Sequence, residues 1–292
     1  MSISMNSLCV ECRLGKDLAT ARQLGTDEQA TAFAKDHMKL FLSLEEGENS
    51  AYFGSLLEDL FRKHFNVGPD RFAEEKAMSN KFVMDRMQTL VSRVEAQEDP
   101  VYAALQFSIL GNYIDFSALR GEVSFEELEK MLDSALEMDL SKETYASFCK
   151  DLETGKKLLY ITDNAGEIGF DRIFAQQIQK AYPHLQITFC VRGGPIQNDA
   201  TREDALAMDL SFPVIDSGNA VGGTVLSTLS PEAKQAMEEA DVVIAKGMGN
   251  TETMYGCGYN VYYAFLVKCE RVLRYFDKPM MTPMFIRDPN FT

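Results

Sequence analysis

Apolar residues in the first half of the chain recur at the spacing of an α-helix. The segment 26–44 opens on a capping box and continues with apolar residues three and four positions apart. Similar stripes run through 52–61 and 82–94, and a second capping box opens another helix at Ser124. This half is therefore predicted to be helical, with no strand before residue 156.

The second half changes to short continuous apolar runs, which are typical of strands buried on both faces of a sheet. Segments with helical spacing lie between these runs, and such alternation indicates a parallel, doubly wound sheet. The expected strands are 158–162, 187–191 and 242–245, with weaker candidates at 213–215 and 280–286, and the expected helices are 168–182, 203–210, 231–240 and 269–276.

The predicted fold class is therefore α/β, with a helical N-terminal part packed on a doubly wound, mainly parallel sheet. The change of pattern predicts a helical N-terminal domain over 1–150 and an α/β domain over 151–292. A chain of 292 residues is long enough for one large domain or two smaller ones.

The balance of acidic and basic residues restricts the classes of molecule that the protein can bind. There are 44 acidic and 29 basic residues, so the formal net charge is −15, which disfavours nucleic acid and anionic membranes. An anionic small molecule would need a local cluster of positive charge.

No apolar run approaches the roughly 18 residues of a membrane span, the N-terminus lacks the features of a secretory signal, and six cysteines make no disulfide framework. We expect a cytoplasmic protein.

Ligands of an open parallel sheet bind at the carboxyl ends of the strands, where the following loops meet. Small and polar residues follow all three strong strands, at 163–167, 192–201 and 246–252. We expect these loops to converge on one edge of the sheet and to form the site.

The side chains of these loops suit a hard cation and a phosphate. Asp163, Asn164 and Asp199 offer the oxygen ligands that Mg²⁺ or Mn²⁺ prefers. Lys246, at a strand end, could neutralise a phosphoryl oxygen. A simpler interpretation of Asp163 is that it caps the following helix.

Glycines in the same loops let the backbone approach an anion closely, and helix N-termini add N–H donors. A simpler interpretation is that they only permit turns. These glycines are Gly193, Gly194, Gly247 and Gly249.

Several familiar motifs are missing. The sequence contains no P-loop, and no dinucleotide-binding glycine pattern follows a strand. Ala165 stands where a D-x-D phosphotransferase would carry its second acid. The three histidines, His37, His64 and His184, lie outside the strand-end loops.

A Cys-x-x-Cys motif at Cys9 and Cys12 precedes an expected helix over 14–24. Three interpretations stay open: a structural role, a metal site completed by a distant cysteine, and a redox pair, although the strand that precedes a thioredoxin motif is missing.

Four motifs, taken in order, carry a resemblance that covers essentially the whole chain. "GNYIDF" (111–116), "TDNAGE" (162–167), "RGGPIQNDAT" (192–201) and "AKGMGNTET" (245–253) resemble the metal-dependent damage-control phosphatases, a family that includes ARMT-like proteins. The N-terminal "CVEC" resembles the prokaryotic stand-alone branch.

The resemblance implies a Rossmann-like sheet and hydrolysis of small phosphorylated metabolites, such as sugar phosphates or damaged cofactor precursors. It implies one divalent metal ion, Mn²⁺, Ni²⁺ or Co²⁺ in the first place and Mg²⁺ as a further candidate, on Asp163, Asn164 and Asp199. It places Lys246 by the transferred phosphoryl group, and either water or a carboxylate such as that of Asp163 attacks. The implied substrate-binding residues are Asn112, Asp115, Arg192, Gly193, Gly247, Asn250 and Glu252.

Some implied roles have alternatives. Asn112 and Asp115 follow a helix and could only cap it and turn the chain. Thr251 stands where an aromatic residue is common in the family, which affects the contact assigned to Glu252. A sensor that binds a phosphorylated ligand without turnover, and a carboxyl methyltransferase, are rival functions. A sensor would not need the metal ligands. A methyltransferase would need an adenosyl-binding glycine motif, which this sequence lacks.

Overall fold

A computed structural model describes residues 3–45, 48–116 and 123–292. Within these residues, six strands form one sheet in the order β3-β2-β1-β4-β5-β6. The first five strands run parallel, and β6 pairs antiparallel with β5. The strands are β1 Lys157–Ile161, β2 Gln186–Val191, β3 Val214–Asp216, β4 Val242–Lys246, β5 Val261–Leu266 and β6 Pro283–Arg287.

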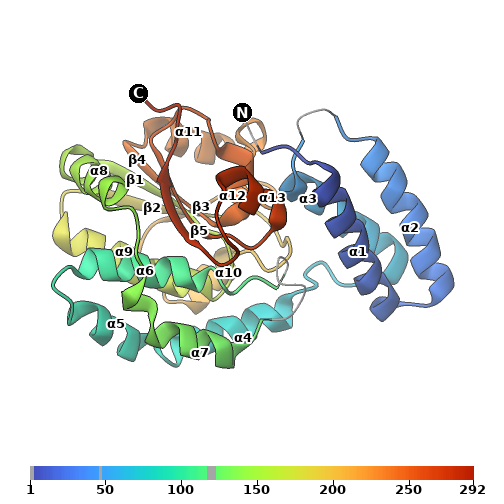
Figure 1. Ribbon diagram of the computed structural model, residues 1–292, viewed down its shortest axis with the longest axis horizontal. Helices are drawn as coiled ribbons and strands as arrows, with labels where there is room; N and C mark the ends of the chain where they lie inside the picture. The colour runs from blue at the N-terminus through green and yellow to red at the C-terminus, as the bar shows by residue number, and fades with distance from the viewer. Residues whose placement is uncertain (1–2, 46–47, 117–122) are drawn as a thin grey trace.

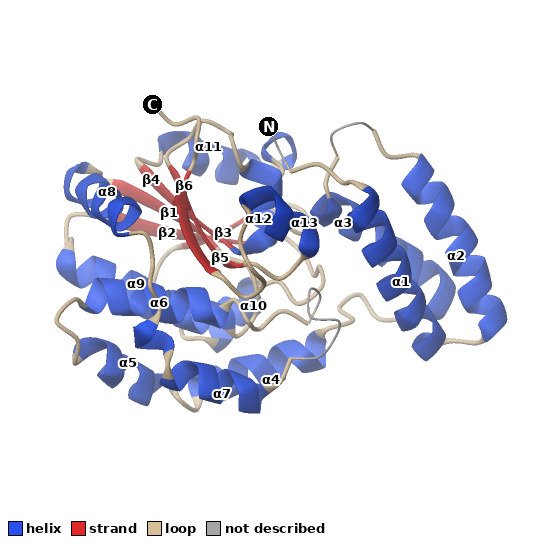
Figure 2. Ribbon diagram, in the orientation of Figure 1, coloured by secondary structure: helices blue, strands red, loops and turns tan. Residues whose placement is uncertain are grey.

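The strand order reverses between β1 and β4, which makes the sheet doubly wound, as predicted. A crevice at the carboxyl ends of the strands is expected at this reversal. Both faces of the sheet are covered by helices (Figure 2), in agreement with the continuous apolar runs of the strands.

Alternate side chains of β1 belong to the two different faces. Leu158 and Tyr160 join the core under α6 and α9, whereas Leu159 and Ile161 join the core under α11, α12 and α13. The helices of the second half are α9 Glu167–Ala181, α10 Arg202–Ala207, α11 Pro231–Glu239, α12 Gly247–Met254 and α13 Glu270–Phe276.

The first three helices form a separate lobe, drawn at the right of Figure 1. Phe33, Phe53 and Phe61 make its small core. The next helices lie against the sheet and share its main core, so that side chains from both sides of residue 150 pack together. The helices of the first half, in chain order, are α1 Ser7–Leu24, α2 Asp27–Leu42, α3 Ser50–Phe65, α4 Ala73–Met84, α5 Met87–Glu95, α6 Pro100–Gly111, α7 Phe125–Asp133 and α8 Lys142–Thr154.

Three local expectations are corrected. The strand β5 was not predicted, although "VYYAFL" is the kind of apolar run used to find the others. The segment 247–254, expected as a loop, is helix α12. Cys9 and Cys12 lie inside α1, which starts at Ser7 because the Asn6 side chain accepts hydrogen bonds from the first turn.

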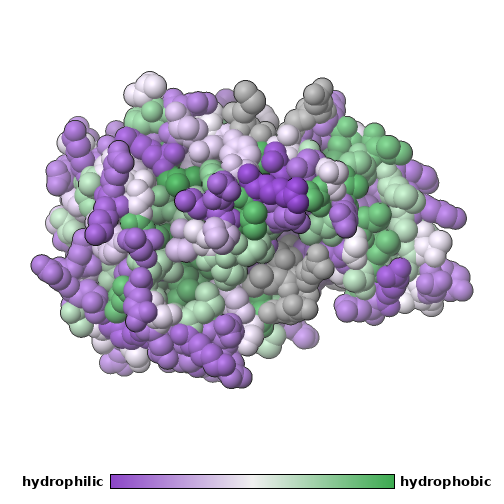
Figure 3. Space-filling view, viewed as in Figure 1, coloured by the Kyte–Doolittle hydropathy of each residue, from purple (hydrophilic) through white to green (hydrophobic). Residues whose placement is uncertain are grey.

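The surface is mostly hydrophilic, and charged side chains cover α4, α5 and α7 (Figure 3). Hydrophobic side chains show over the α1–α3 lobe, where Leu42 is 82% exposed. In the part of the chain that the structure describes, no helix has the length and apolar character needed to cross a membrane.

Candidate active site

Backbone hydrogen bonds tie the loop after β1 to the loop after β2. Asn164 and Asp199 form an isolated antiparallel bridge. The N–H of Ala165 donates to Asn198 O at 2.8 Å, and the N–H of Ala200 donates to Asp163 O at 2.7 Å. The three expected metal ligands are therefore brought together, at the edge of the sheet where the predicted site lies.

The carboxylate of Asp163 lies at the N-terminus of α12 and is buried. Its Oδ2 accepts hydrogen bonds from Asn112 Nδ2 at 3.0 Å and from Asn164 Nδ2 at 2.8 Å. Gly247 has φ +81°, and a Cβ at this position would lie 2.0 Å from Asp163 Oδ2. Only glycine leaves room for the carboxylate here. The cap of α9 is Gly166, without a side-chain hydrogen bond, so the simple capping role of Asp163 is not observed.

Two buried carboxylates face each other in this site. Burial, together with the charges of Asp199 and Glu167, raises the pKa of Asp163 well above its ordinary value. Burial also raises the pKa of Asp199, although Arg192 acts in the opposite direction. Arg192 Nε donates to Asp199 Oδ2 at 2.6 Å, whereas Arg192 Nη2 lies 3.9 Å from Asp163 Oδ1. A divalent cation between the carboxylates would offset this repulsion.

The amide of Asn164 is oriented by its neighbours. Its Nδ2 donates to Glu167 Oε2 at 2.7 Å, and its Oδ1 accepts from Asn198 Nδ2 at 2.9 Å. A carbonyl oxygen has two lone pairs, which leaves one for a metal ion. Two carboxylates and one amide oxygen thus fit a hard divalent cation.

A cavity of about 1050 Å³ opens beside these ligands. Lys268, two residues beyond the end of β5, lines it. Its Nζ donates to Asp115 Oδ2 at 2.6 Å and to Asn112 O at 2.5 Å. The charge of Lys268 also acts to lower the pKa of Asp163, so the ammonium lies near this expected metal ligand. Four residues of α1 also line the cavity: Cys9, Cys12, Arg13 and Lys16.

The residues expected to bind substrate divide into two groups. Asp115 and Glu252 line the cavity. Asn112, Arg192 and Asn250 are buried and hold other residues: Asn112 donates to Asp163, and Asn250 Oδ1 accepts from Arg192 Nη2 at 3.2 Å.

The two glycines that were expected to bind substrate, Gly247 and Gly193, both contact other parts of the protein. Gly247 lies under Asp163, as described above. Gly193 donates its N–H to Asn219 O at 2.9 Å, and a Cβ here would lie 2.5 Å from Asn219 N. Gly193 therefore lets two loops pack closely, and the described cavity beside the metal ligands does not include it.

Lys246 lies beneath the site. Its side chain is fully buried, and Nζ lies 3.2 Å from Glu167 and 3.1 Å from Asp171. Nζ also donates to Ser108 O and Oγ, each at 2.6 Å. Among the described residues that line the cavity, Lys246 is absent. The contact expected between Lys246 and a phosphoryl group stays a prediction. In this structure the ammonium of Lys246 contacts buried acids, and Lys268 is the lysine that lines the cavity.

The buried acids around Lys246 were missed by the sequence reasoning. Asp171 accepts from Tyr160 and Ser108, each at 2.8 Å, and burial raises its pKa to about 6 against the lowering effect of Lys246. Glu167 belongs to the "TDNAGE" motif, so the sequence pointed to it. Asp171 lies inside helix α9, and no motif or pattern in the sequence distinguishes it from a surface residue. Lys268 could have been found, because it follows an apolar run that qualifies as a strand.

The cysteines of the N-terminal motif lie on the cavity wall, as does Cys269. All six cysteines are free thiols. Among the described residues, no three Cys, His, Asp or Glu side chains gather in a way that could hold a metal ion. The cysteine–metal interpretation is therefore without support, and the other two stay open.

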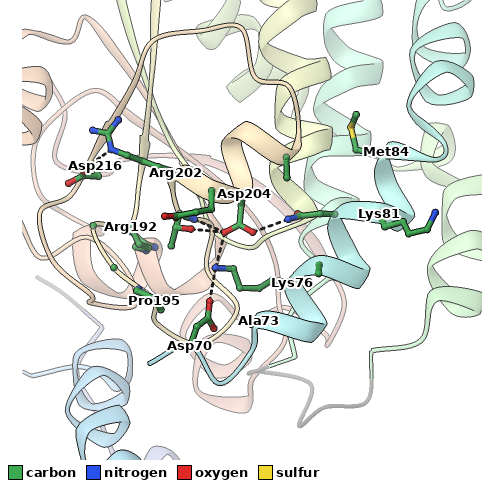
Figure 4. Close-up of a pocket in the computed structure, with 17 residues that line it drawn as sticks. Asp70, Ala73, Lys76, Lys81, Met84, Arg192, Pro195, Arg202, Asp204 and Asp216 are labelled. Carbon is green, nitrogen blue, oxygen red and sulfur yellow. Dashed lines mark hydrogen bonds and ion pairs between the residues drawn. The ribbon is translucent and has the colours of Figure 1, made fainter. Parts of the chain in front are cut away.

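A second cavity, of about 760 Å³, lies between α4 and the loop after β2 (Figure 4). Lys76 crosses it and pairs with Asp70 at 3.2 Å and with Asp204 at 2.8 Å. Arg202 pairs with Asp216 at 2.7 Å. The charged groups at its centre thus already have partners within the protein.

Comparison with known proteins decides the family. The model of the damage-control phosphatase ARMT1-like domain matches residues 5–282. This chain belongs to that family. It is 31% identical over 278 residues to a damage-control phosphatase of Archaeoglobus fulgidus, covering 93% of this chain and 95% of that protein. It is 33% identical over 245 residues to the damage-control phosphatase PH1575 of Pyrococcus horikoshii, covering 82% of each.

The fold agrees with the family. The crystal structure of a DUF89 family protein, PH1575 of Pyrococcus horikoshii, superposes with a TM-score of 0.84 at 27% identity and covers 99% of both chains. Relatives that carry the name damage-control phosphatase support a phosphatase activity for this family member.

Proposed function

We propose that this chain is a divalent-metal-dependent phosphomonoesterase that acts on small phosphorylated metabolites, such as sugar phosphates or damaged phosphometabolites. One observation carries the proposal: Asp163, Asn164 and Asp199 meet beside a cavity that also contains the ammonium of Lys268. Oxygen ligands next to a cation and an open cavity suit a phosphate ester.

Asp163, Asn164 and Asp199 would hold one ion of Mn²⁺, Ni²⁺, Co²⁺ or Mg²⁺. When bound, the ion supplies a Lewis acid that polarises a phosphoryl oxygen. Asn112 orients Asp163, and Arg192 orients Asp199. Such outer partners keep ligands in place.

Lys268 would bind a phosphoryl oxygen and offset the charge that develops on it. Asp115 holds the ammonium in position. Glu252 lines the same cavity, and burial raises its pKa to about 7. Its carboxyl group can therefore carry a proton near neutral pH, which it could donate to the oxygen atom of the leaving group. Either water or the Asp163 carboxylate would attack the phosphorus atom.

The test is phosphate release from sugar phosphates and p-nitrophenyl phosphate by protein stripped with EDTA and reloaded with Mn²⁺, Co²⁺, Ni²⁺ or Mg²⁺. We expect activity only after reloading, and none for Asp199→Asn. Asp216→Asn is the matched control, since Asp216 pairs with Arg202 at the end of β3, and it should keep activity. A folded, metal-loaded protein that releases no phosphate would contradict the proposal.

A further inference from the structure

The two loops that carry the proposed metal ligands are both tied to helix α4, which belongs to the first half of the chain. The side chain of Asn80 on α4 is only 8% exposed. Its Oδ1 accepts a hydrogen bond from the N–H of Gly166, in the loop after β1, at 2.7 Å. Its Nδ2 donates to Asp204 Oδ1 at 2.9 Å, in the helix α10 that follows the loop after β2. One buried amide therefore connects both loops.

The first hydrogen bond fixes the turn that follows Asn164. Gly166 has φ +77°, and a Cβ there would lie 2.7 Å from Ser79 Cβ and 3.0 Å from Ser79 C. The backbone of this turn thus lies directly against α4. Because Gly166 stands only two residues after Asn164, a displacement of the turn would also displace the amide ligand.

The second hydrogen bond fixes the end of the loop after β2. Asp204 Oδ2 accepts from the N–H and from Oγ1 of Thr201, each at 2.9 Å, at the start of α10. Lys76, one turn before Asn80 on α4, lies 2.8 Å from the same oxygen (Figure 4). Thr201 stands two residues after Asp199, so α4 holds the backbone next to this carboxylate ligand as well.

The loop after β2 needs such an anchor, because it lines both cavities. Residues 192–195 and Thr201 line the second cavity, whereas Gln197 and Asp199 line the cavity beside the proposed metal ligands. Where a loop borders a cavity, side-chain packing cannot hold it, and directed hydrogen bonds have to fix its position. A buried polar network whose members are satisfied provides this rigidity.

Only an amide suits both contacts of Asn80. The N–H of Gly166 needs an acceptor, and the carboxylate of Asp204 needs a donor. Aspartate at this position would provide only the acceptor, and leucine, of similar size, would provide neither.

We propose that Asn80 is a positioning residue for the metal site. It holds the loops of Asn164 and Asp199 in the relative position that one cation needs, and it acts through Gly166 and Asp204 rather than on the cation itself. Outer partners of this kind commonly determine metal affinity. This inference rests on the metal site of the proposed function.

The first test is calorimetric titration of EDTA-stripped protein with Mn²⁺. Asn80→Leu removes both hydrogen bonds and should weaken Mn²⁺ binding about 10-fold. Gln106→Met is the matched control. Gln106 is also a buried amide with two hydrogen bonds, from Nε2 to Leu136 O at 3.1 Å and to Met138 O at 2.7 Å, but its partners belong to neither metal loop.

Both variants lose a buried amide, so both should unfold at a lower temperature, and only Asn80→Leu should bind Mn²⁺ more weakly. An unchanged affinity of folded Asn80→Leu would overturn the inference. A loss of affinity that Gln106→Met shares would overturn it too, because the loss would then follow from general destabilisation.

Exchange of the two partners gives a second test, which decides the matter if Asn80→Leu does not fold. Asn80→Asp keeps the acceptor for Gly166 but places a second carboxylate beside Asp204, so Mn²⁺ should bind more weakly. Adding Asp204→Asn returns a donor to the pair and restores its total charge, and the double variant should recover most of the lost affinity. A double variant that binds Mn²⁺ no better than Asn80→Asp would refute the role of Asn80.

The proposed function and the role of Asn80 can fail separately. If the wild type binds Mn²⁺ but releases no phosphate, and Asn80→Leu binds Mn²⁺ more weakly, the phosphatase function fails and the positioning role stands. If the wild type releases phosphate and Asn80→Leu binds Mn²⁺ equally well, the positioning role fails and the phosphatase function stands. A wild type that binds no Mn²⁺ overturns both.

Discussion

At Lys246 a single ammonium offsets two buried carboxylates. Burial lowers its pKa, but the charges of Asp171 and Glu167 outweigh that effect and leave the pKa above its ordinary value. The side chain therefore stays charged and stabilises the helix–sheet junction below the site. Removing it would leave both acids without their cation.

We predict that Lys246→Met lowers the free energy of unfolding by about 3–5 kcal/mol, because one partner of a buried ion pair is lost. Urea denaturation at pH 8 measures the change. Lys234→Met, on the exposed face of α11, is the control and should stay within about 0.5 kcal/mol of the wild type. Lost activity at unchanged stability would instead return Lys246 to a direct catalytic role.

Glu252 predicts a pH dependence of stability. Burial raises its pKa from 4.5 to about 7, so the folded state binds this proton more tightly than the unfolded chain. The contribution of Glu252 to stability is therefore lost as pH rises through this window. Glu252→Gln should match the wild type in this respect near pH 4 and exceed its stability by up to about 3 kcal/mol at pH 8.

Unfolding by urea at pH 5 and pH 8, with EDTA in every sample, tests this dependence. Glu153→Gln, on the exposed face of α8, is the control and should show no such trend. A difference between Glu252→Gln and the wild type that does not grow between the two pH values would refute the assignment.

At the scale of elements, the direct passage from β4 into α12 shapes the proposed metal site. The turn needs the positive φ of Gly247, and the carboxylate of Asp163 fills the space that a Cβ would take. The N-terminus of a helix favours a negative charge. The start of α12 and the end of β1 therefore position one ligand together.

Gly247→Ala should weaken Mn²⁺ binding at least about 10-fold, because the methyl group displaces Asp163 and strains the turn. Calorimetric titration with Mn²⁺ measures the affinity. Gly249→Ala is the matched control, since its Cβ would meet neighbours no closer than 3.4 Å, and its affinity should be nearly that of the wild type. Equal affinities for the two variants would disprove the role of the turn.

At the scale of the molecule, we expect the proposed metal site to be coupled to global stability. Asp163 and Asp199 are buried together, and their pKa values are raised, so the metal-free protein carries unfavourable charge repulsion. A cation that binds only the folded state stabilises it by mass action.

Mn²⁺ at about 100 times its Kd should add about 2.7 kcal/mol of stability. Differential scanning calorimetry should show a rise in Tm of roughly 4 °C, which EDTA reverses. Asp199→Asn should show almost no Mn²⁺-dependent shift. The expectation fails if Mn²⁺ stabilises Asp199→Asn as much as the wild type.

The sequence alone determined the fold class, and it predicted that the three proposed metal ligands lie together. Parallel strands end at one edge of their sheet, so Asp163, Asn164 and Asp199 had to lie near one another once their strands were recognised. The helical first half followed from periodicity and capping, because these signals are local.

Tertiary structure decided which charges face the cavity. Lys246 ends a recognised strand, yet its side chain turns under the sheet edge to Glu167 and Asp171, whereas Lys268 follows the unpredicted strand β5. No local pattern could place Arg13 and Lys16 in the lining of the cavity that Asp163 and Asp199 also line. Their position results from the packing of α1 and α3 against α12 and α13, contacts between residues more than 180 positions apart in the chain, and such contacts leave no periodic trace in a single sequence.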